Sequence, residues 1–142
     1  MPTREDLIKR AREYVGVPYR HQGRSADIGV DCIGLPICAF HKDHGLGDYD
    51  TTEYTRRPNA QTFKQGAINA GYLPIPLNDA KTADLLHMAM PRWPVHCGVL
   101  DIDETGKKWV IHAYMPMKMV VREPYEKVLK NIVGAWRHKD LN

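Results

Sequence analysis

The sequence lacks a long hydrophobic run: no apolar stretch reaches the roughly 18 residues that a membrane-spanning helix needs. We therefore expect no membrane span. The first residues, Met-Pro-Thr-Arg-Glu-Asp, lack the apolar core and small-residue cleavage site of a signal peptide, so secretion by a standard route is not predicted. Lysine and arginine are dispersed and form no basic run, and the net charge is only +3. This pattern argues against nucleic acid binding.

Cysteine is scarce as well. The three cysteines cannot all pair, and without a secretory signal there is little reason to expect a disulfide framework, so at least one thiol should be free. The chain also lacks internal repeats, low-complexity tracts and a visible domain boundary. Its 142 residues, of which 43% are hydrophobic, suffice for one domain with a conventional core. We therefore expect a single domain over residues 1–142.

The first half of the chain carries helical patterns. Thr3 and Asp6 form a candidate capping box, followed by apolar residues at helical spacing, which predicts a helix over residues 4–15. A continuous apolar stretch predicts a buried helix at 32–44, and a further helix is expected at 59–70. The polar, glycine-rich segments between these helices, residues 19–30 and 45–60, are expected to be loops or extended chain.

The second half changes character. Short apolar segments are separated by turn signals such as the one at residues 103–106, which is typical of antiparallel strands. The predicted strands are residues 84–90, 95–102, 108–115, 118–123 and 132–137. Pro74 and Pro76 are expected to form a stiff connector before them. Helices first and strands afterwards indicate an α+β domain, with the helices packed on one antiparallel sheet.

Cys32 is the candidate nucleophile. It directly follows a Gly-Val-Asp loop and stands at the predicted start of a buried helix, where unpaired backbone N–H groups and the helix dipole favour an anion. A cysteine in an arbitrary apolar stretch is most often a core residue, and Cys38, deeper in the same helix, is interpreted in that way. The position of Cys32 instead predicts a thiol with a lowered pKa.

His96 and His112 are the candidate partners of this thiol, because a thiolate nucleophile needs a base and the base needs an orienting group. Alternation sends His96 and Gly98 to one face of their strand, and the turn at 103–106 makes the strand of His112 its hairpin neighbour. Both imidazoles are therefore expected to lie side by side. The remaining histidines are interpreted as structural: His21, His41, His44, His87 and His138.

A metal site is the alternative use of these residues. The zinc-competent side chains are Cys32, Cys38, His41, His44, His96, Cys97 and His112. Structural zinc sites usually show Cys-x₂₋₄-Cys or His-x₃₋₅-His spacing, whereas five residues separate Cys32 from Cys38 and two separate His41 from His44. The spacing disfavours zinc, and we expect no metal and no other cofactor.

Four motifs together resemble the NlpC-type peptidases, papain-like enzymes that hydrolyse peptidoglycan stem peptides, and in particular the members encoded with bacteriophage tails and gene-transfer agents. The motifs are Val17-Pro18-Tyr19-Arg20-His21-Gln22-Gly23, Asp31-Cys32-Ile33-Gly34-Leu35, His96-Cys97-Gly98-Val99 and Ile111-His112-Ala113. Their order and spacing extend the resemblance over roughly residues 5 to 137. The chain departs from the family at Ile33, Pro36 and Cys97, where a small residue, a residue other than proline and valine are common.

The resemblance implies a set of site residues. It places the nucleophile on Cys32, the general base on His96 and the polar orienting residue on His112. Tyr19 matches the tyrosine on the substrate side, a candidate oxyanion donor together with the backbone N–H of Cys32. Asp31 matches the acidic residue beside the nucleophile on this side of the site, and we expect it to order the loop or cap the helix.

The resemblance also implies a function. The expected reaction is hydrolysis of peptidoglycan stem peptides at the bond between D-glutamate and diaminopimelate. The expected setting is the tail of a virion or gene-transfer agent, with the protein made in the bacterial cytoplasm without a signal peptide and bound to tail-tip or hub proteins. The alternative is a structural tail protein that keeps the fold and has little or no activity.

Overall fold

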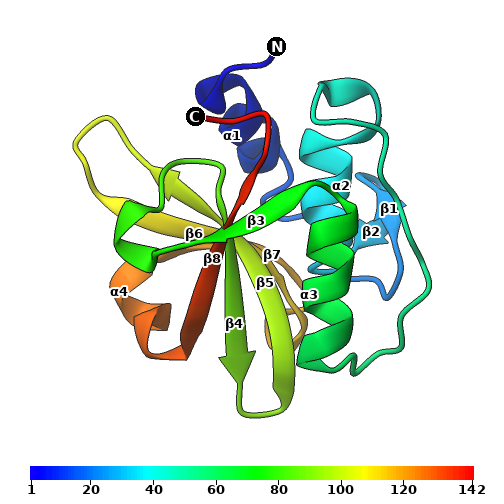
Figure 1. Ribbon diagram of the computed structural model, residues 1–142. Helices are drawn as coiled ribbons and strands as arrows, with labels where there is room; N and C mark the ends of the chain where they lie inside the picture. The colour runs from blue at the N-terminus through cyan, green and yellow to red at the C-terminus, as the bar shows by residue number, and fades with distance from the viewer.

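The computed structural model describes the backbone of residues 1–142 and all side chains except those of Asp43 and Pro94. Its central element is a six-stranded sheet in which every neighbouring pair is antiparallel. The strands are β3 (Tyr72–Ile75), β4 (Leu85–Met90), β5 (Trp93–Ile102), β6 (Lys108–Tyr114), β7 (Met119–Pro124) and β8 (Ile132–His138). Their order across the sheet is β3-β8-β4-β5-β6-β7 (Figure 1). The predicted α+β architecture is confirmed.

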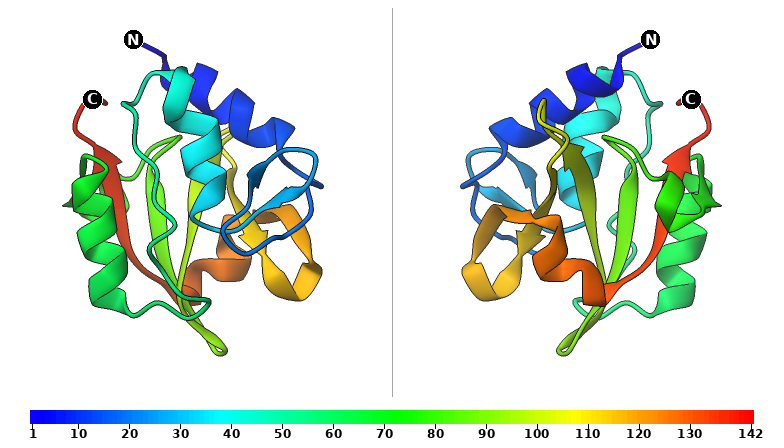
Figure 2. Two further views of the ribbon diagram at one scale, coloured as in Figure 1. Left: turned by 90° about the vertical axis from the view of Figure 1, so that its right-hand side faces the viewer. Right: turned by 90° about the vertical axis from the view of Figure 1, so that its left-hand side faces the viewer.

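Helices cover the two faces of this sheet unequally. Helices α1 (Arg4–Glu13), α2 (Gly34–Phe40) and α3 (Ala60–Asn69) lie on one face, and the short α4 (Tyr125–Val128) lies on the other (Figures 1 and 2). The two chain termini lie close to each other at one end of the molecule (Figure 2). The turn that joins β4 to β5 lies at the opposite end of the molecule (Figure 1).

Each face of the sheet carries its own hydrophobic core. The larger cluster lies between the three helices and the sheet and includes Leu7, Phe40 and Val99. The smaller cluster lies under α4 and includes Met88 and Val128. Successive strand residues point to opposite faces, and each face is covered by one of these clusters, so the central strands are buried on both sides. None of the described helices has the length and apolar character needed to cross a lipid bilayer.

Two of the predicted helices begin at the expected side-chain caps. The Thr3 hydroxyl accepts a hydrogen bond from Asp6 N, and the Asp6 carboxylate accepts one from Thr3 N, each at 3.0 Å. This capping box starts α1, which ends at Glu13, close to the predicted boundary. The Asn59 side chain accepts from Thr62 N at 2.8 Å and starts α3 in the same way.

The buried helix is shorter than the prediction of 32–44. Its regular part ends where the backbone of His41 becomes extended, and a 3₁₀-helix, Lys42–His44, follows. Gly45 then adopts a left-handed conformation, with φ of 108°, which a residue with a side chain would tolerate poorly. Pro36 lies within α2, and because it has no N–H the Cys32 carbonyl oxygen lacks its helical partner and accepts from the Cys97 thiol instead.

Two segments expected to be irregular contain strands. The interpretation of Pro74 as part of a connector is wrong, because it lies in β3 and pairs with Trp136 of β8. Because β3 is an edge strand, no further strand lies on its outer side, and proline is tolerated there although it has no backbone N–H to donate. Within the predicted loop 19–30, β1 (Arg24–Ser25) and β2 (Gly29–Val30) form a small antiparallel pair.

Strands β5 and β6 separate toward one end of the sheet. Within the described backbone, their ladder runs only from Val99↔Ile111 to Ile102↔Lys108. Beyond it, β5 still pairs with β4, and β6 still pairs with β7 as far as Tyr114↔Met119. The chain just before α2 reaches this opening, where the Cys97 thiol donates to the carbonyl oxygen of Cys32 at 2.9 Å.

Candidate active site

Cys32 lies in the first turn that leads into α2. The Asp31 carbonyl oxygen accepts a hydrogen bond from Leu35 N at 3.0 Å, and its carboxylate accepts from Gly34 N at 2.8 Å. These are the two bonds of a helix N-cap, so the hydrogen-bonded turn begins at Asp31 although the regular helix begins at Gly34. Cys32 is therefore the first residue after the cap.

Asp31 orders this turn with both of its carboxylate oxygens. Its second oxygen accepts from Gln22 N and from the Tyr54 hydroxyl, each at 2.7 Å, and the side chain is nearly inaccessible to solvent. The Arg24 guanidinium lies 3.4 Å from the first oxygen. In each of these contacts the Asp31 carboxylate accepts the hydrogen bond. The hydrogen bond from Gly34 N supports the capping role expected for Asp31.

His96 of β5 and His112 of β6 meet across the opening between their strands. His96 Nε2 lies 2.7 Å from His112 Nδ1, and both side chains are buried. Gly98 makes the meeting possible, because a Cβ atom there would lie 2.7 Å from Val110 Cγ1 and 3.1 Å from His112 Cβ. The side-by-side placement predicted from strand alternation is confirmed.

Glu123 of β7 extends this contact and was missed by the sequence analysis. Its Oε1 lies 2.8 Å from His112 Nε2, and its Oε2 lies 3.0 Å from Lys127 Nζ. Glu123 pairs with Val110, and cross-strand partners point to the same face, as do alternate residues of one strand. The register of the β6–β7 hairpin was the signal that would have brought Glu123 beside His112.

The Cys32 thiol has a pKa lowered to about 5. The largest cause is a hydrogen bond from Cys97, followed after the opposing effect of burial by the hydrogen bond and charge of His96. In the structure the Cys97 thiol donates to the Cys32 carbonyl oxygen at 2.9 Å, so its proton lies beside Cys32. The side chains that lower the pKa are thus Cys97 and His96, and of these only His96 was expected from the sequence.

His112 is held in its neutral form. Burial and the nearby charge of His96 together lower the pKa of its imidazole to about 4, against the opposing effect of Glu123. At neutral pH His112 therefore adds no charge to the pair. His112 is fully buried, and its ring contacts His96 on one side and Glu123 on the other.

A narrow cleft of about 20 Å³ brings most of the expected site residues together. Its lining includes Tyr19, Asp31, Cys32, His96 and Tyr114. Burial raises the pKa of the Tyr19 hydroxyl far above its usual range, and the neighbouring Cys32 raises it further. Tyr19 therefore keeps its proton and can donate a hydrogen bond into the cleft.

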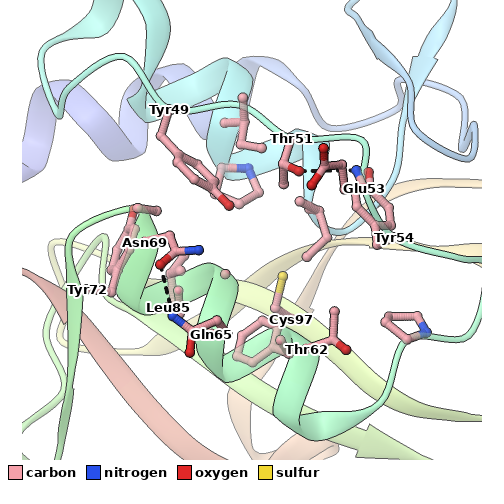
Figure 3. Close-up of a pocket in the computed structure, with 18 of the residues that line it drawn as sticks. Tyr49, Thr51, Glu53, Tyr54, Thr62, Gln65, Asn69, Tyr72, Leu85 and Cys97 are labelled. Atoms are coloured by element: carbon pink, nitrogen blue, oxygen red, sulfur yellow. Dashed lines mark hydrogen bonds between the residues drawn. The ribbon is translucent and has the colours of Figure 1, made fainter.

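A larger cavity of about 460 Å³ adjoins the cleft on the helix side of the sheet. Figure 3 shows Tyr49, Thr51 and Tyr54 of the segment before α3 on one side of it and Gln65 and Asn69 of α3 on the other. The two cavities share lining residues, which are Ile33, Tyr54 and Pro58. The walls of the larger cavity are mainly apolar, with hydroxyl and amide groups among the apolar side chains. This volume is in the range of pockets that bind small ligands.

The zinc-competent residues are not arranged as a metal site. Among the side chains that the structure describes, no group of three or more His, Cys, Asp or Glu residues is placed to hold a metal ion. Cys38 lies in the core, as expected, and its thiol has a pKa raised by burial. His41 binds Gly47 O and the Tyr72 hydroxyl, away from Cys32.

Residues 16–137 match the NlpC/P60 family. The chain belongs to this family. NlpC/P60 proteins are cysteine peptidases and amidases that act on peptidoglycan, and the present chain has the fold of these hydrolases. The family predicted from the sequence motifs is thereby confirmed, whereas the phage-tail branch stays a prediction. No curated protein matches the chain.

Solved structures show the same fold. The NlpC/p60 domain of the peptidoglycan hydrolase SagA is 20% identical with a TM-score of 0.62, and the match covers 96% of this chain and 99% of that one. An NLP/P60 family protein from Staphylococcus aureus, described as similar to lipoprotein, is 18% identical with a TM-score of 0.60, over 94% of this chain and 40% of that one. An N-acetylmuramoyl-L-alanine amidase from Bacteroides uniformis is 18% identical with a TM-score of 0.51, over 94% and 96%.

Proposed function

We propose that this NlpC/P60 protein is a cysteine peptidase that hydrolyses peptidoglycan stem peptides, with Cys32 as nucleophile, His96 as base and His112 as the residue that orients His96. One observation carries the proposal: a thiol of lowered pKa lies against an imidazole whose far nitrogen is bonded to a second, neutral imidazole. This is the arrangement that nucleophilic catalysis by cysteine needs, namely a thiolate, a base and an orienting group.

The proposed reaction has two steps. The Cys32 thiolate attacks the carbonyl carbon of the peptide bond, and His96 protonates the amine that leaves. Water, deprotonated by His96, then hydrolyses the thioester and frees the enzyme. The tetrahedral oxyanion of each step would accept hydrogen bonds from the backbone N–H of Cys32 and from Tyr19, whose raised pKa keeps its hydroxyl protonated.

The proposed substrate is a peptide that crosses the cleft at Cys32 and extends into the adjoining cavity. Tyr54 and Pro58 border both spaces, so one bound chain can occupy them together. Hydroxyl and amide side chains on the cavity walls, such as Thr51 and Gln65, suit a peptide backbone. The bond proposed to be cut lies between D-glutamate and diaminopimelate, and the proposed setting is the tail of a virion or gene-transfer agent. The motif resemblance supports both.

The test is a digest of diaminopimelate-type peptidoglycan, analysed by mass spectrometry for new amino termini. The wild-type protein should release them and Cys32→Ala should not, while Cys38→Ala is the matched control because that buried thiol is remote from the cleft. Cleavage after D-glutamate would support the proposed bond. Identical intact muropeptides from wild type and Cys32→Ala across pH 5 to 9 would overturn hydrolysis and favour the structural tail protein.

A further inference from the structure

We propose that Glu123 is a positioning residue, which fixes the tautomers of His112 and His96 so that only His96 Nδ1 exchanges a proton with Cys32. The inference rests on the proposed role of His96 as base. It concerns a carboxylate that touches neither the nucleophile nor the cleft and that acts through two rings. The chain of contacts Cys32, His96, His112 and Glu123 is called the histidine chain below.

The geometry of the histidine chain is set by neighbouring strands. Glu123 Oε1 lies 2.8 Å from His112 Nε2, and His112 Nδ1 lies 2.7 Å from His96 Nε2. Strands β6 and β7 pair along six positions, from Trp109↔Pro124 to Tyr114↔Met119, which holds the carboxylate and the imidazole at a fixed separation. The side chain of His112 is fully buried and that of Glu123 is 16% exposed, so neither is free to rotate into solvent.

The carboxylate dictates the first tautomer. Partial burial would raise the pKa of Glu123, but hydrogen bonds from Lys127 and His112 outweigh it, and the pKa is lowered. An ionised carboxylate offers only lone pairs, so the hydrogen of the 2.8 Å contact must stand on His112 Nε2. Because His112 is neutral at pH 7, its Nδ1 then carries no hydrogen.

The second tautomer follows from the first. A bare His112 Nδ1 can only accept, so the hydrogen of the 2.7 Å contact stands on His96 Nε2. His96 keeps this hydrogen in its neutral and in its charged form. The nitrogen left to gain and lose a proton is Nδ1, on the side where the ring bonds the Cys32 thiol. Proton exchange is thereby confined to one atom of the base.

Glu123 also compensates the charge that forms on His96. When His96 takes the Cys32 proton, its positive charge faces a neutral ring, whose far side is polarised by the carboxylate. A second cation next to His96 is avoided because burial keeps His112 neutral. Lys127 bonds the other oxygen of Glu123 and helps to keep the carboxylate ionised, but its side chain is 70% exposed, so the ion pair adds little to the stability of the fold.

The experiment compares Glu123→Gln and Glu123→Ala with Glu126→Gln, which removes an exposed carboxylate from α4 that lies outside the histidine chain. Glutamine has the same shape but offers both an acceptor and a donor, so it no longer dictates a tautomer. Two readouts need no hydrolysis: long-range ¹H–¹⁵N spectra of the histidine rings at pH 7, and the pH midpoint of Cys32 alkylation by iodoacetamide.

The wild type and Glu126→Gln should show His112 protonated at Nε2. In Glu123→Gln this resonance should become a mixture of tautomers, and in Glu123→Ala the alkylation midpoint of Cys32 should rise by about one pH unit. Turnover should fall about 10- to 100-fold through kcat, with KM little changed, as when an outer partner of a functional histidine is lost.

The inference is overturned when folded Glu123→Gln and Glu123→Ala keep the wild-type tautomer and the wild-type alkylation midpoint. Failure of the proposed function gives a different result. In that case the wild type releases no amino termini from peptidoglycan, yet the tautomer of His112 still depends on Glu123, so the two failures can be told apart.

Discussion

Two groups of buried histidines in this protein use their imidazole nitrogens in different ways. In the first, His41 Nδ1 bonds Gly47 O at 3.2 Å and its Nε2 bonds the Tyr72 hydroxyl at 2.9 Å, while His138 Nδ1 accepts from the backbone N of Asp140. We call these residues the His41 cluster. In the histidine chain, His96 gives only Nε2 to a permanent partner. Both groups are almost completely shielded from solvent.

The comparison shows that burial and hydrogen bonding do not by themselves make a histidine reactive. Both ring nitrogens of His41 are engaged by neutral groups that cannot take up or release a proton at neutral pH. His96 has one nitrogen left, and it faces a thiol whose pKa is lowered to about 5. The number of nitrogens left uncommitted, and what they face, distinguishes the base from the structural residue.

The largest effect is expected on replacing one histidine of each group with alanine. His96→Ala should lower kcat/KM by about 10⁶, because loss of the base of a catalytic triad costs about as much as loss of the nucleophile. His41→Ala should instead destabilise the fold by about 3 kcal/mol, since it leaves a cavity and an unpaired Tyr72 hydroxyl. The measurements are peptidoglycan turnover and urea unfolding of each variant. Comparable losses of turnover in both folded variants would contradict the distinction.

His112→Ala should have a smaller effect on turnover than His96→Ala. An orienting residue usually costs nearer 10⁴ than 10⁶, so a measurable remainder should persist. Single-turnover kinetics with an excess of enzyme would detect it. A folded His112→Ala protein with wild-type turnover would show that another residue orients His96.

The pH dependence of stability should reflect both groups. Burial lowers the pKa of His112 from 6.5 to about 4 and lowers those of His41 and His138 as well. Below pH 6.5 the unfolded chain binds protons that the native protein excludes, so stability is present above this pH and is lost as pH falls toward 4. His112 alone accounts for about 3 kcal/mol at about 1.4 kcal/mol per unit. Unfolding midpoints at pH 7 and pH 5 test this, and an unchanged midpoint would contradict it.

The smallest predicted effect concerns the reactivity of the nucleophile. Iodoacetamide should label Cys32 before Cys38 or Cys97, because the pKa values of the other two thiols are raised. Cys97→Val removes the hydrogen bond from Cys97, the largest cause of the lowered pKa of Cys32, so the labelling midpoint should rise from about 5 toward the ordinary range. Mass spectrometry of the adducts gives the order of labelling. Preferred labelling of Cys97 in the wild type would argue against Cys32 as nucleophile.

Local sequence signals predicted much of this fold. The capping box at Thr3, the Asn59 cap and the apolar alternation of the later strands all act over a few residues, so they can be recognised in the sequence. Strand β3 was missed because Pro74 reads as a break, and only the neighbouring β8 shows that it lies on an edge. The break in α2 at His41 depends on partners far along the chain in the same way.

The site was predictable to the same extent. Alternation and one turn were enough to place His96 beside His112, and the order of motifs pointed to Cys32. Glu123 required the register of a second hairpin, and the hydrogen bond from Cys97 required the separation of β5 and β6. Both depend on how strands pair, which a single sequence specifies weakly.

The separation of β5 and β6 has a practical consequence. The site lies at the open end of this hairpin, whereas the turn at 103–106 lies at the other end, beyond four paired positions from Val99↔Ile111 to Ile102↔Lys108. Glu104 and Thr105 are exposed at the tip of the turn. A fluorophore or affinity peptide inserted there would be mechanically insulated from Cys32 by the ladder, which makes this turn the preferred attachment point for reporters of substrate binding.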